Sequence, residues 1–392
     1  MAGPLAGLKV IEIAGIGPGP FACMLLADMG ADVIRVDRPG GGNLGATDHP
    51  ADVLQRGRRS IAVNLKSPEG VDTVLKLVES ADVLTEGYRP GVMEKLGLGP
   101  DVCLQRNPKL IYARMTGWGQ DGPLSQAAGH DINYIAITGA LASIGRGDSG
   151  GPVPPLNLLG DFGGGSMYLI MGVLSALYER SQSGQGQVID AAITDGVISL
   201  MAAIQGFQGV GMWDGEQRQS NMLDGGSHYY DTYECADGKW ISIGSIEPQF
   251  YAELAEKLEM PELLDENGQV DFMKQFDKTQ WKILKENISA RIATKTRDDW
   301  VEIMEGSDVC FAPVLTMAEA PKHHHNAARQ SFVDVEGYSQ TAPAPRFSRT
   351  PGEVGRHPVK PGTDTDSILA ELGLDADSIA TLKSSGAIAE SE

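Results

Sequence analysis

Cysteine is scarce in this chain of 392 residues, and the few that occur are widely spaced. Cys23, Cys103, Cys235 and Cys310 form no CxxC pair, and no ligand histidines flank them. This pattern argues against a disulfide scaffold and against a zinc site, and it fits a reducing compartment. We therefore expect a cytoplasmic protein without a metal centre.

Positive charge is also in short supply, because 32 basic residues face 52 acidic ones and the net charge is −20. The average field of such a chain repels nucleic acid and anionic membrane surfaces, so neither is an expected partner. An anionic small molecule would need a local cluster of basic residues. The longest apolar run, residues 167–178, is shorter than the roughly 20 residues that span a bilayer, so we expect no membrane insertion.

The first half of the chain alternates between strand-like and helix-like segments. Strands are predicted at the β-branched runs 8–15, 31–39, 58–67, 82–88 and 110–119. Helical spacing follows the first and third of these runs, and Ser67 is the expected cap of the second helix. Such alternation predicts the α/β class, with an open sheet of parallel strands wrapped by helices.

The second half has a different texture. After residue 205 the chain is rich in glycine and aperiodic, and a hairpin then surrounds Asp237-Gly238. Helical stretches follow at 248–260 and 278–305, the second with a capping box that begins at Thr296. These segments predict a small α+β unit carried on long connectors, and the histidines at 323–325 are expected in a solvated loop.

The first loop invites a dinucleotide-binding interpretation. Gly15 and Gly17 fit the GxGxxG fingerprint, but Pro20 occupies its third glycine position. Pro18 and Pro20 also lack the N–H groups that would bind a pyrophosphate, and Arg38 directly follows Asp37, the expected ribose acid. The loop therefore supports the fold but argues against a nicotinamide dinucleotide.

Basic residues gather near the predicted strands although the chain as a whole is acidic. They are Arg35, Arg38, Arg56, Arg58, Arg59, Lys66 and Arg89. Any one of them has an ordinary alternative as a solvated, ion-paired surface residue. A cluster at the carboxyl ends of strands instead indicates a site for a phosphorylated ligand, because guanidinium groups suit phosphate oxygens.

Three acidic or titratable positions are candidates for chemistry. Asp161 precedes Gly163–Gly165 and an apolar helix, so it is either a helix cap or a carboxylate at a helix start where N–H groups favour negative charge. His130 lies among small residues, where it is either a hydrogen-bonded core histidine or a catalytic group, and Asp131 could orient its ring or cap a turn. Glu247, before Pro248, is either a helix-start acid or a carboxylate that reaches a catalytic group.

Several longer motifs carry a resemblance to a known family. They are "GLKVIEIAGIGPGPFACMLLADMGADVIRVDRP", "EGYRPGVMEKLGLGP", "LIYARMTGWGQDGP", "AGHDINY", "GDFGGGSM", "MLDGGSHYYDTYECADGKWISIGSIEPQFY" and "APAPRFSRTP". In this order and over nearly the whole chain, they resemble the family III CoA-transferase superfamily, and most of all its racemase branch.

The resemblance implies an intertwined homodimer in which each chain threads through the other. It implies a large, Rossmann-like, CoA-binding domain with a small α+β domain on two linkers. The expected bounds are 1–192 plus 331–392 for the large domain, 193–228 for a linker, 229–316 for the small domain and 317–330 for the second linker.

The resemblance also implies residue roles. In the transferase branch an aspartate that matches Asp161 is a nucleophile that forms a CoA thioester, whereas in the racemase branch it is a base opposite His130. Glu247 matches a glutamate that pairs with this histidine. The set expected at the CoA-binding region is Arg38, Arg59, Arg89, Gly163 and Asp131.

A mechanism with two bases would explain why a histidine is present. A transferase that works through an aspartyl thioester has no evident need for a second base. We therefore expect a racemase that interconverts (2R)- and (2S)-2-methylacyl-CoA thioesters through an enolate, with His130 and Asp161 on opposite faces. No cofactor is required, because CoA is part of the substrate. The alternatives are a family III CoA-transferase that uses Asp161 as nucleophile, and a non-catalytic acyl-CoA-binding protein.

Overall fold

A seven-stranded sheet forms the centre of the larger part of the protein, in a computed structural model that describes residues 3–41, 48–147 and 150–389. Its strands are β1 (Lys9–Ile13), β2 (Asp32–Asp37), β3 (Arg58–Val63), β4 (Val83–Glu86), β5 (Ile111–Thr116), β6 (Gln187–Ala192) and β12 (Ile388–Ala389). The order is β12-β3-β2-β1-β4-β5-β6, and every pairing is parallel except that of β12 with β3. The order 3-2-1-4-5-6 is that of doubly wound α/β folds, so the predicted class is confirmed.

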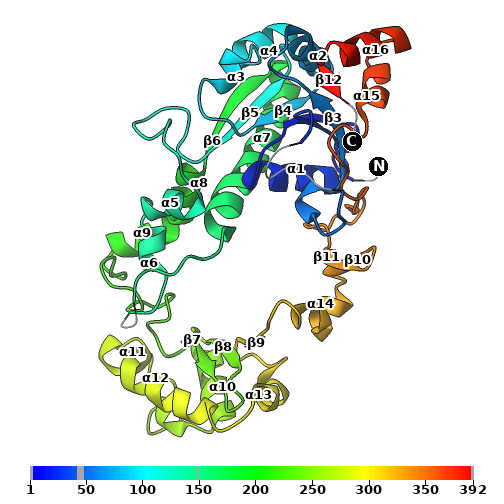
Figure 1. Ribbon diagram of the computed structural model, residues 1–392. Coiled ribbons are helices and arrows are strands. Elements are labelled where there is room, and N and C mark those ends of the chain that lie inside the picture. The colour runs from blue at the N-terminus through cyan, green and yellow to red at the C-terminus, as the bar shows by residue number, and fades with distance from the viewer. Residues whose placement is uncertain (1–2, 42–47, 148–149, 390–392) are drawn as a thin grey trace. The chain divides into compact units, whose positions relative to one another are not determined.

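Helices cover both faces of this sheet (Figure 1). On one face, α2 (Pro68–Glu79), α4 (Pro100–Arg106), α15 (Thr365–Glu371) and α16 (Ala376–Ser384) bury apolar side chains against residues such as Ile11, Ile61 and Tyr112. On the other face lie α1 (Pro18–Asp28) and α7 (Met167–Ser183), which contact each other. Ser67 Oγ accepts the Gly70 N–H at the start of α2, as the sequence predicts.

The helix that contains α7 is longer than its apolar run suggests. A π-helix, η2 (Leu158–Ser166), continues directly into α7, and the joined segment Leu158–Ser183 is long and apolar enough to cross a membrane by length and composition alone. The estimate from the run at 167–178 was too short because it omitted the glycine-rich π-helical turns. In the fold this segment packs on β5 and β6, as a core helix does, and the absence of membrane insertion stays a prediction.

Contacts divide the chain into two compact units, and the path crosses between them more than once. The larger unit comprises Met1–Thr138, Leu156–Leu200 and His324–Glu392, and the smaller comprises Gly139–Pro155 and Met201–His323. The first expected linker holds two helices, α8 (Ile193–Leu200) and α9 (Ala202–Gly209). This division by contacts does not test the predicted bounds of domains and linkers, which stay predictions.

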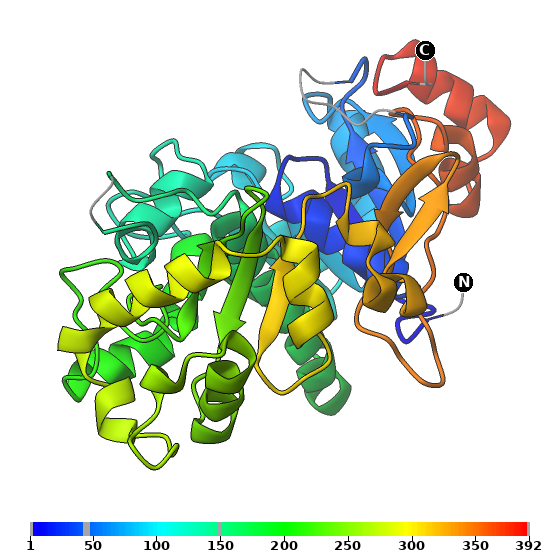
Figure 2. The same ribbon diagram turned by 90° about the horizontal axis from the view of Figure 1, so that it is seen from below.

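The smaller unit is built on a three-stranded antiparallel sheet, β7 (Tyr230–Glu234), β8 (Trp240–Gly244) and β9 (Phe311–Val314). Its main helices are α10 (Pro248–Leu258), α12 (Lys278–Ile292) and α13 (Arg297–Met304), seen from two sides in Figure 1 and Figure 2. Trp281 and Trp300 lie in its core. The predicted hairpin and the capping box from Thr296 to Asp299 are both confirmed.

The shorter elements complete the description. They are α3 (Val92–Lys95), α5 (Asp131–Ala136), α6 (Ala140–Ser143), α11 (Phe272–Gln275), α14 (His324–Ala328), β10 (Phe332–Val335) and β11 (Tyr338–Thr341), with single 3-10 turns at Val53–Gln55, Pro261–Leu263 and Ala320–Lys322. The prediction of a solvated loop at residues 323–325 is confirmed only for solvation of His324 and His325, which are exposed but lie in a helix. His323 Nε2 lies 2.8 Å from Glu305 Oε1, both side chains are partly buried, and His324 begins α14.

Candidate active site

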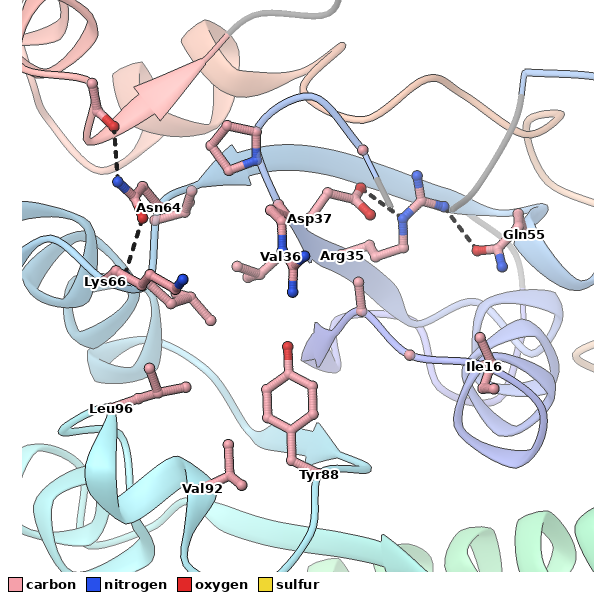
Figure 3. A pocket seen from close by; sticks show the side chains of 18 residues that line it. Ile16, Arg35, Val36, Asp37, Gln55, Asn64, Lys66, Tyr88, Val92 and Leu96 are labelled. Carbon is pink, nitrogen blue, oxygen red and sulfur yellow. Dashed lines mark hydrogen bonds and ion pairs between the residues drawn. The ribbon is translucent and has the colours of Figure 1, made fainter. Parts of the chain in front are cut away.

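A cavity of about 930 Å³ opens in the larger unit at the carboxyl ends of β1, β2 and β3 (Figure 3). Arg38 and Lys66 line it, and the Tyr88 hydroxyl points into it. Burial raises the pKa of the Tyr88 phenol, and the positive charge of Arg38 opposes that rise, so the two side chains are near each other. The cavity therefore joins two cationic side chains to a ring that can contact a base or a ribose.

Asp37 occupies the position of a ribose-binding acid, but its carboxylate is hydrogen-bonded to other side chains of the protein. Its Oδ2 accepts hydrogen bonds from Arg35 Nε at 2.8 Å and from Ser60 Oγ at 2.5 Å. Burial raises the pKa of the Asp37 carboxyl, while Arg35 and Ser60 act to lower it. Arg35 also donates to Gln55 Oε1 at 2.9 Å, as Figure 3 shows. An acid held in this closed network is a poor ligand for a ribose, in agreement with the argument against a nicotinamide dinucleotide.

The predicted cluster of basic residues separates into two groups. Arg56, Arg58 and Arg59 precede or begin β3, so they lie at its amino end and not at the carboxyl end. Arg56 and Arg58 are buried and ion-paired. The Arg59 guanidinium is paired with Asp32 and Glu371, both at 2.7 Å, and it does not line the cavity. The expected position of Arg59 at the CoA region is therefore corrected.

The cations that do follow carboxyl ends of strands are Arg38, Lys66 and Arg89, after β2, β3 and β4. Arg89 is exposed and adjoins Tyr88, which lines the cavity. Its charge also acts on Tyr134, since Arg89 opposes the rise of the Tyr134 pKa that burial and the Asp161 charge produce. Arg89 thus connects the cavity with the surroundings of Asp161.

His130 lies at the N-terminus of α5, with its imidazole exposed. The backbone on either side of it is held by side chains. Asn133 Oδ1 accepts the His130 N–H at 3.1 Å, and the Tyr134 hydroxyl donates to the Gly129 carbonyl. The Tyr134 ring meets that of Trp118 edge to face, 4.8 Å between centroids. The imidazole is therefore accessible to a substrate, and the backbone that carries it is held in place.

Asp161 lies within the π-helix η2, whose N-terminal flanking residue is Asn157, so the interpretation of Asp161 as a helix cap is wrong. Asn157 Nδ2 donates to Asp161 Oδ2 at 3.3 Å. The carboxylate faces Gly17 of the β1–α1 loop, where a Cβ would lie 3.2 Å from Oδ2. Burial raises the pKa of the Asp161 carboxyl; Asn157 and the nearby His130 act to lower it, and the Asp131 charge to raise it. π-helical turns often occur at functional sites.

Asp131 does not orient the His130 ring through any hydrogen bond described for it. It is buried, 7% exposed, and its Oδ2 accepts the backbone N–H of Asp161 at 2.7 Å. The expected ligand role of Asp131 is therefore replaced by a structural one, as a direct connection between α5 and η2. His130, Asp131 and Asp161 are brought together by this contact.

The glycines after Asp161 serve helix packing. A Cβ on Gly164 would lie 2.5 Å from Val197 Cγ2, and one on Gly165 would lie 3.1 Å from Ile193 Cγ1, both on α8. Gly163 lies inside the continuous helical segment and not at its start. The expected helix start after Asp161 is therefore wrong, because the helical segment begins at Leu158, and the place of Gly163 in the CoA-binding region stays a prediction.

Glu247 belongs to the smaller unit, where it precedes α10 with an exposed side chain. Its pairing with His130 stays a prediction. The sequence analysis missed Tyr88 and Asn157. The four-residue spacing from Asn157 to Asp161, which places two residues on one helical face, was the signal for the second of them.

The fold and the site define the class of this protein: the chain belongs to CoA-transferase family III, whose profile matches residues 5–366. The predicted resemblance is thereby confirmed. Alpha-methylacyl-CoA racemase of Mus musculus is 44% identical over 383 residues, covering 97% of this chain and 96% of that protein. The Homo sapiens enzyme of the same name is 41% identical with the same coverage. A CAIB/BAIF family protein from Brucella suis has the same fold, with a TM-score of 0.79, 27% identity, and coverage of 95% of this chain and 100% of that one.

Proposed function

We propose that the protein is a racemase that interconverts (2R)- and (2S)-2-methylacyl-CoA thioesters. The observation that carries this proposal is the contact that brings a histidine and a carboxylate together, with Asp131 beside His130 bound to the Asp161 N–H. The identity of 44% and 41% to two racemases over nearly the whole chain supports the same conclusion.

The cavity suits the nucleotide end of CoA. Arg38 and Lys66 supply positive charge at the carboxyl ends of β2 and β3, where open α/β sheets bind their ligands. Guanidinium and ammonium groups neutralise phosphate oxygens, and the Tyr88 ring offers an apolar face. CoA enters as part of the substrate, and the reaction needs no resident metal or redox cofactor.

Racemisation requires one base on each face of C2. One group, His130 or Asp161, takes the C2 proton, and the electron pair of that C–H bond passes into the thioester to form a planar enolate. The conjugate acid of the other group then returns a proton to the opposite face. The raised pKa of Asp161 favours this role, because general acid–base catalysis is most efficient when the group titrates near the working pH. A Glu247 carboxylate beside His130 would stabilise the imidazolium.

Proton exchange at C2 tests this function. The wild-type protein, incubated with one isomer of a 2-methylacyl-CoA in deuterated water, is expected to yield inverted product that carries deuterium at C2. His130→Ala and Asp161→Ala should each abolish inversion while keeping the fold. Near-wild-type inversion in either variant contradicts the two-base assignment. Transfer of CoA to a free acid, with a thioester trapped on Asp161 and no label at C2, would instead identify a transferase.

We also propose that the protein forms the intertwined homodimer expected from its family. Along α7, Met167, Met171 and Tyr178 are 49%, 56% and 73% exposed, and their spacing places them on one helical face. An apolar face of this kind favours burial against another chain. Light scattering should give the mass of two chains, and Met171→Glu with Tyr178→Glu should give one. A wild-type protein that stays monomeric at micromolar concentration overturns the dimer.

A further inference from the structure

A buried hydrogen bond joins α5 and η2. Asp131 Oδ2 lies 2.7 Å from the Asp161 nitrogen, and the carboxylate is almost fully buried between the two helices. Gly160 makes this approach possible, because a Cβ there would lie 2.3 Å from Asp131 Oδ2 and 3.0 Å from Ile135 Cγ2. A side chain at position 160 would displace the Asp131 carboxylate from this contact.

The two ends of this contact are the two residues proposed as bases. Asp131 directly follows His130 in the chain, and its carboxylate binds the backbone of Asp161 itself. The path from one base to the other is therefore a peptide bond, one buried side chain and one hydrogen bond. A hydrogen bond to an ionised acceptor is short and strong, and in a buried place it resists stretching.

We propose that Asp131 is a positioning residue that fixes the separation of His130 and Asp161, so that both can reach one carbon atom. This inference rests on the proposed racemase function. It gives Asp131 no contact with substrate; its oxygen atom acts through the Asp161 N–H. A displacement of about 1 Å at a reacting group can lower the rate about 10²-fold. A contact that fixes the separation of the two bases therefore has a large effect on a reaction that needs both.

Exchange and inversion of the C2 proton separate positioning from stability. Exchange alone needs one base, and the exposed His130 can return a solvent deuteron to the face from which it took a proton. Inversion needs both bases. Loss of folded protein lowers the two rates in proportion, whereas misplacement of one base lowers inversion more than exchange. The ratio of inversion to exchange is therefore the readout.

Three variants test the positioning role of Asp131. Asp131→Ala should lower inversion by about 10²-fold and the ratio at least tenfold. Asp131→Asn keeps an oxygen that accepts the Asp161 N–H, and it should restore the ratio to within a few-fold of wild type. Gly160→Ala leaves Asp131 in place but drives its carboxylate away, and it should reproduce the effect of Asp131→Ala. Asp28→Asn, which removes a buried charge at the far end of α1, is the control that lowers stability and keeps the ratio.

A wild-type ratio in Asp131→Ala and Gly160→Ala overturns the inference. Amide hydrogen exchange gives a second readout that does not depend on activity. The Asp161 amide should be protected from exchange in wild type and in Asp131→Asn, and should lose this protection in Asp131→Ala. Equal protection in all three contradicts the positioning role of Asp131. Failure of the proposed function is recognised separately, because the wild-type protein would then incorporate no deuterium at C2.

Discussion

Replacing Gly196 by alanine tests whether the packing of α8 on η2 positions Asp161. Helix propensity alone would make this change favourable by about 1 kcal/mol, since glycine is a poor residue inside a helix. The structure predicts the opposite sign. A Cβ on Gly196 would lie 1.9 Å from the Gly164 carbonyl oxygen and 2.7 Å from its carbon, and both are backbone atoms that no side-chain rotation can move away.

The size of the effect follows from the required displacement. To reach an ordinary contact of 3.4 Å, the two segments have to separate by about 1.5 Å. Overpacking of a core in this way costs typically about 1–3 kcal/mol, so after the gain in helix propensity the net loss of stability is up to about 2 kcal/mol. The melting temperature should therefore fall by up to roughly 8 °C, at about 2–4 °C per kcal/mol for a unit of this size. Because Asp161 lies on the displaced segment and inversion needs both bases, inversion at C2 should fall about 10²-fold.

The assay is thermal unfolding together with the rate of inversion at C2. Gly206→Ala is the matched control, because Gly206 lies in helix α9 and a Cβ there meets nothing within 4 Å. The control should be unchanged or slightly more stable, with a wild-type rate of inversion. If Gly196→Ala keeps the wild-type melting temperature and rate of inversion, the close crossing does not hold Asp161 in place and the reasoning fails.

Other substitutions have equally direct outcomes. Arg38→Ala should raise KM for acyl-CoA with little change in kcat, whereas Arg59→Ala, measured in the same titration, should leave KM near wild type because its guanidinium is engaged in ion pairs away from the cavity. Asn157→Leu removes a donor that lowers the pKa of Asp161, so that pKa should rise further; since the deprotonated carboxylate is the base, the acid limb of the pH–rate profile should move to higher pH, and an unmoved limb contradicts the role of Asn157. Arg56→Met leaves a buried carboxylate of α1 without its partner and should lower the free energy of unfolding by about 3–5 kcal/mol in urea denaturation; a loss below about 1 kcal/mol would mean that water or another group compensates the charge.

Local patterns were sufficient to predict five of the seven strands of the sheet, β1 to β5. The strands are short β-branched runs, and the first turn of α2 begins at Ser67 with Pro68, so residue type and spacing determine these elements before any tertiary contact forms. The same holds for the hairpin at Asp237-Gly238, where Gly238 adopts a φ of 74°. Class and element order were therefore accessible from the sequence.

The sequence did not reveal in this way which group each arginine or glycine contacts. Arg38 and Arg59 are both arginines near predicted strands, yet one lines the cavity and the other is ion-paired at the opposite end of β3. The difference depends on Glu371, more than three hundred residues further along the chain, which no local pattern reveals. Likewise, Gly164 and Gly165 indicate a close approach, but whether of a ligand or of another helix depends on where α8 lies.

The interrupted course of the chain has a consequence for how the protein is made. The smaller unit ends at His323, while the larger one still lacks its third segment, His324–Glu392. That last segment supplies Ile368, Leu369 and Ile379 to the core and β12 to the free side of β3. On the ribosome, where synthesis proceeds at about 5–20 residues per second, the smaller unit can close first. The outer hydrogen-bonding groups of β3 stay unpaired until β12 has been synthesised, and an unpaired strand edge is a surface on which another chain can pair.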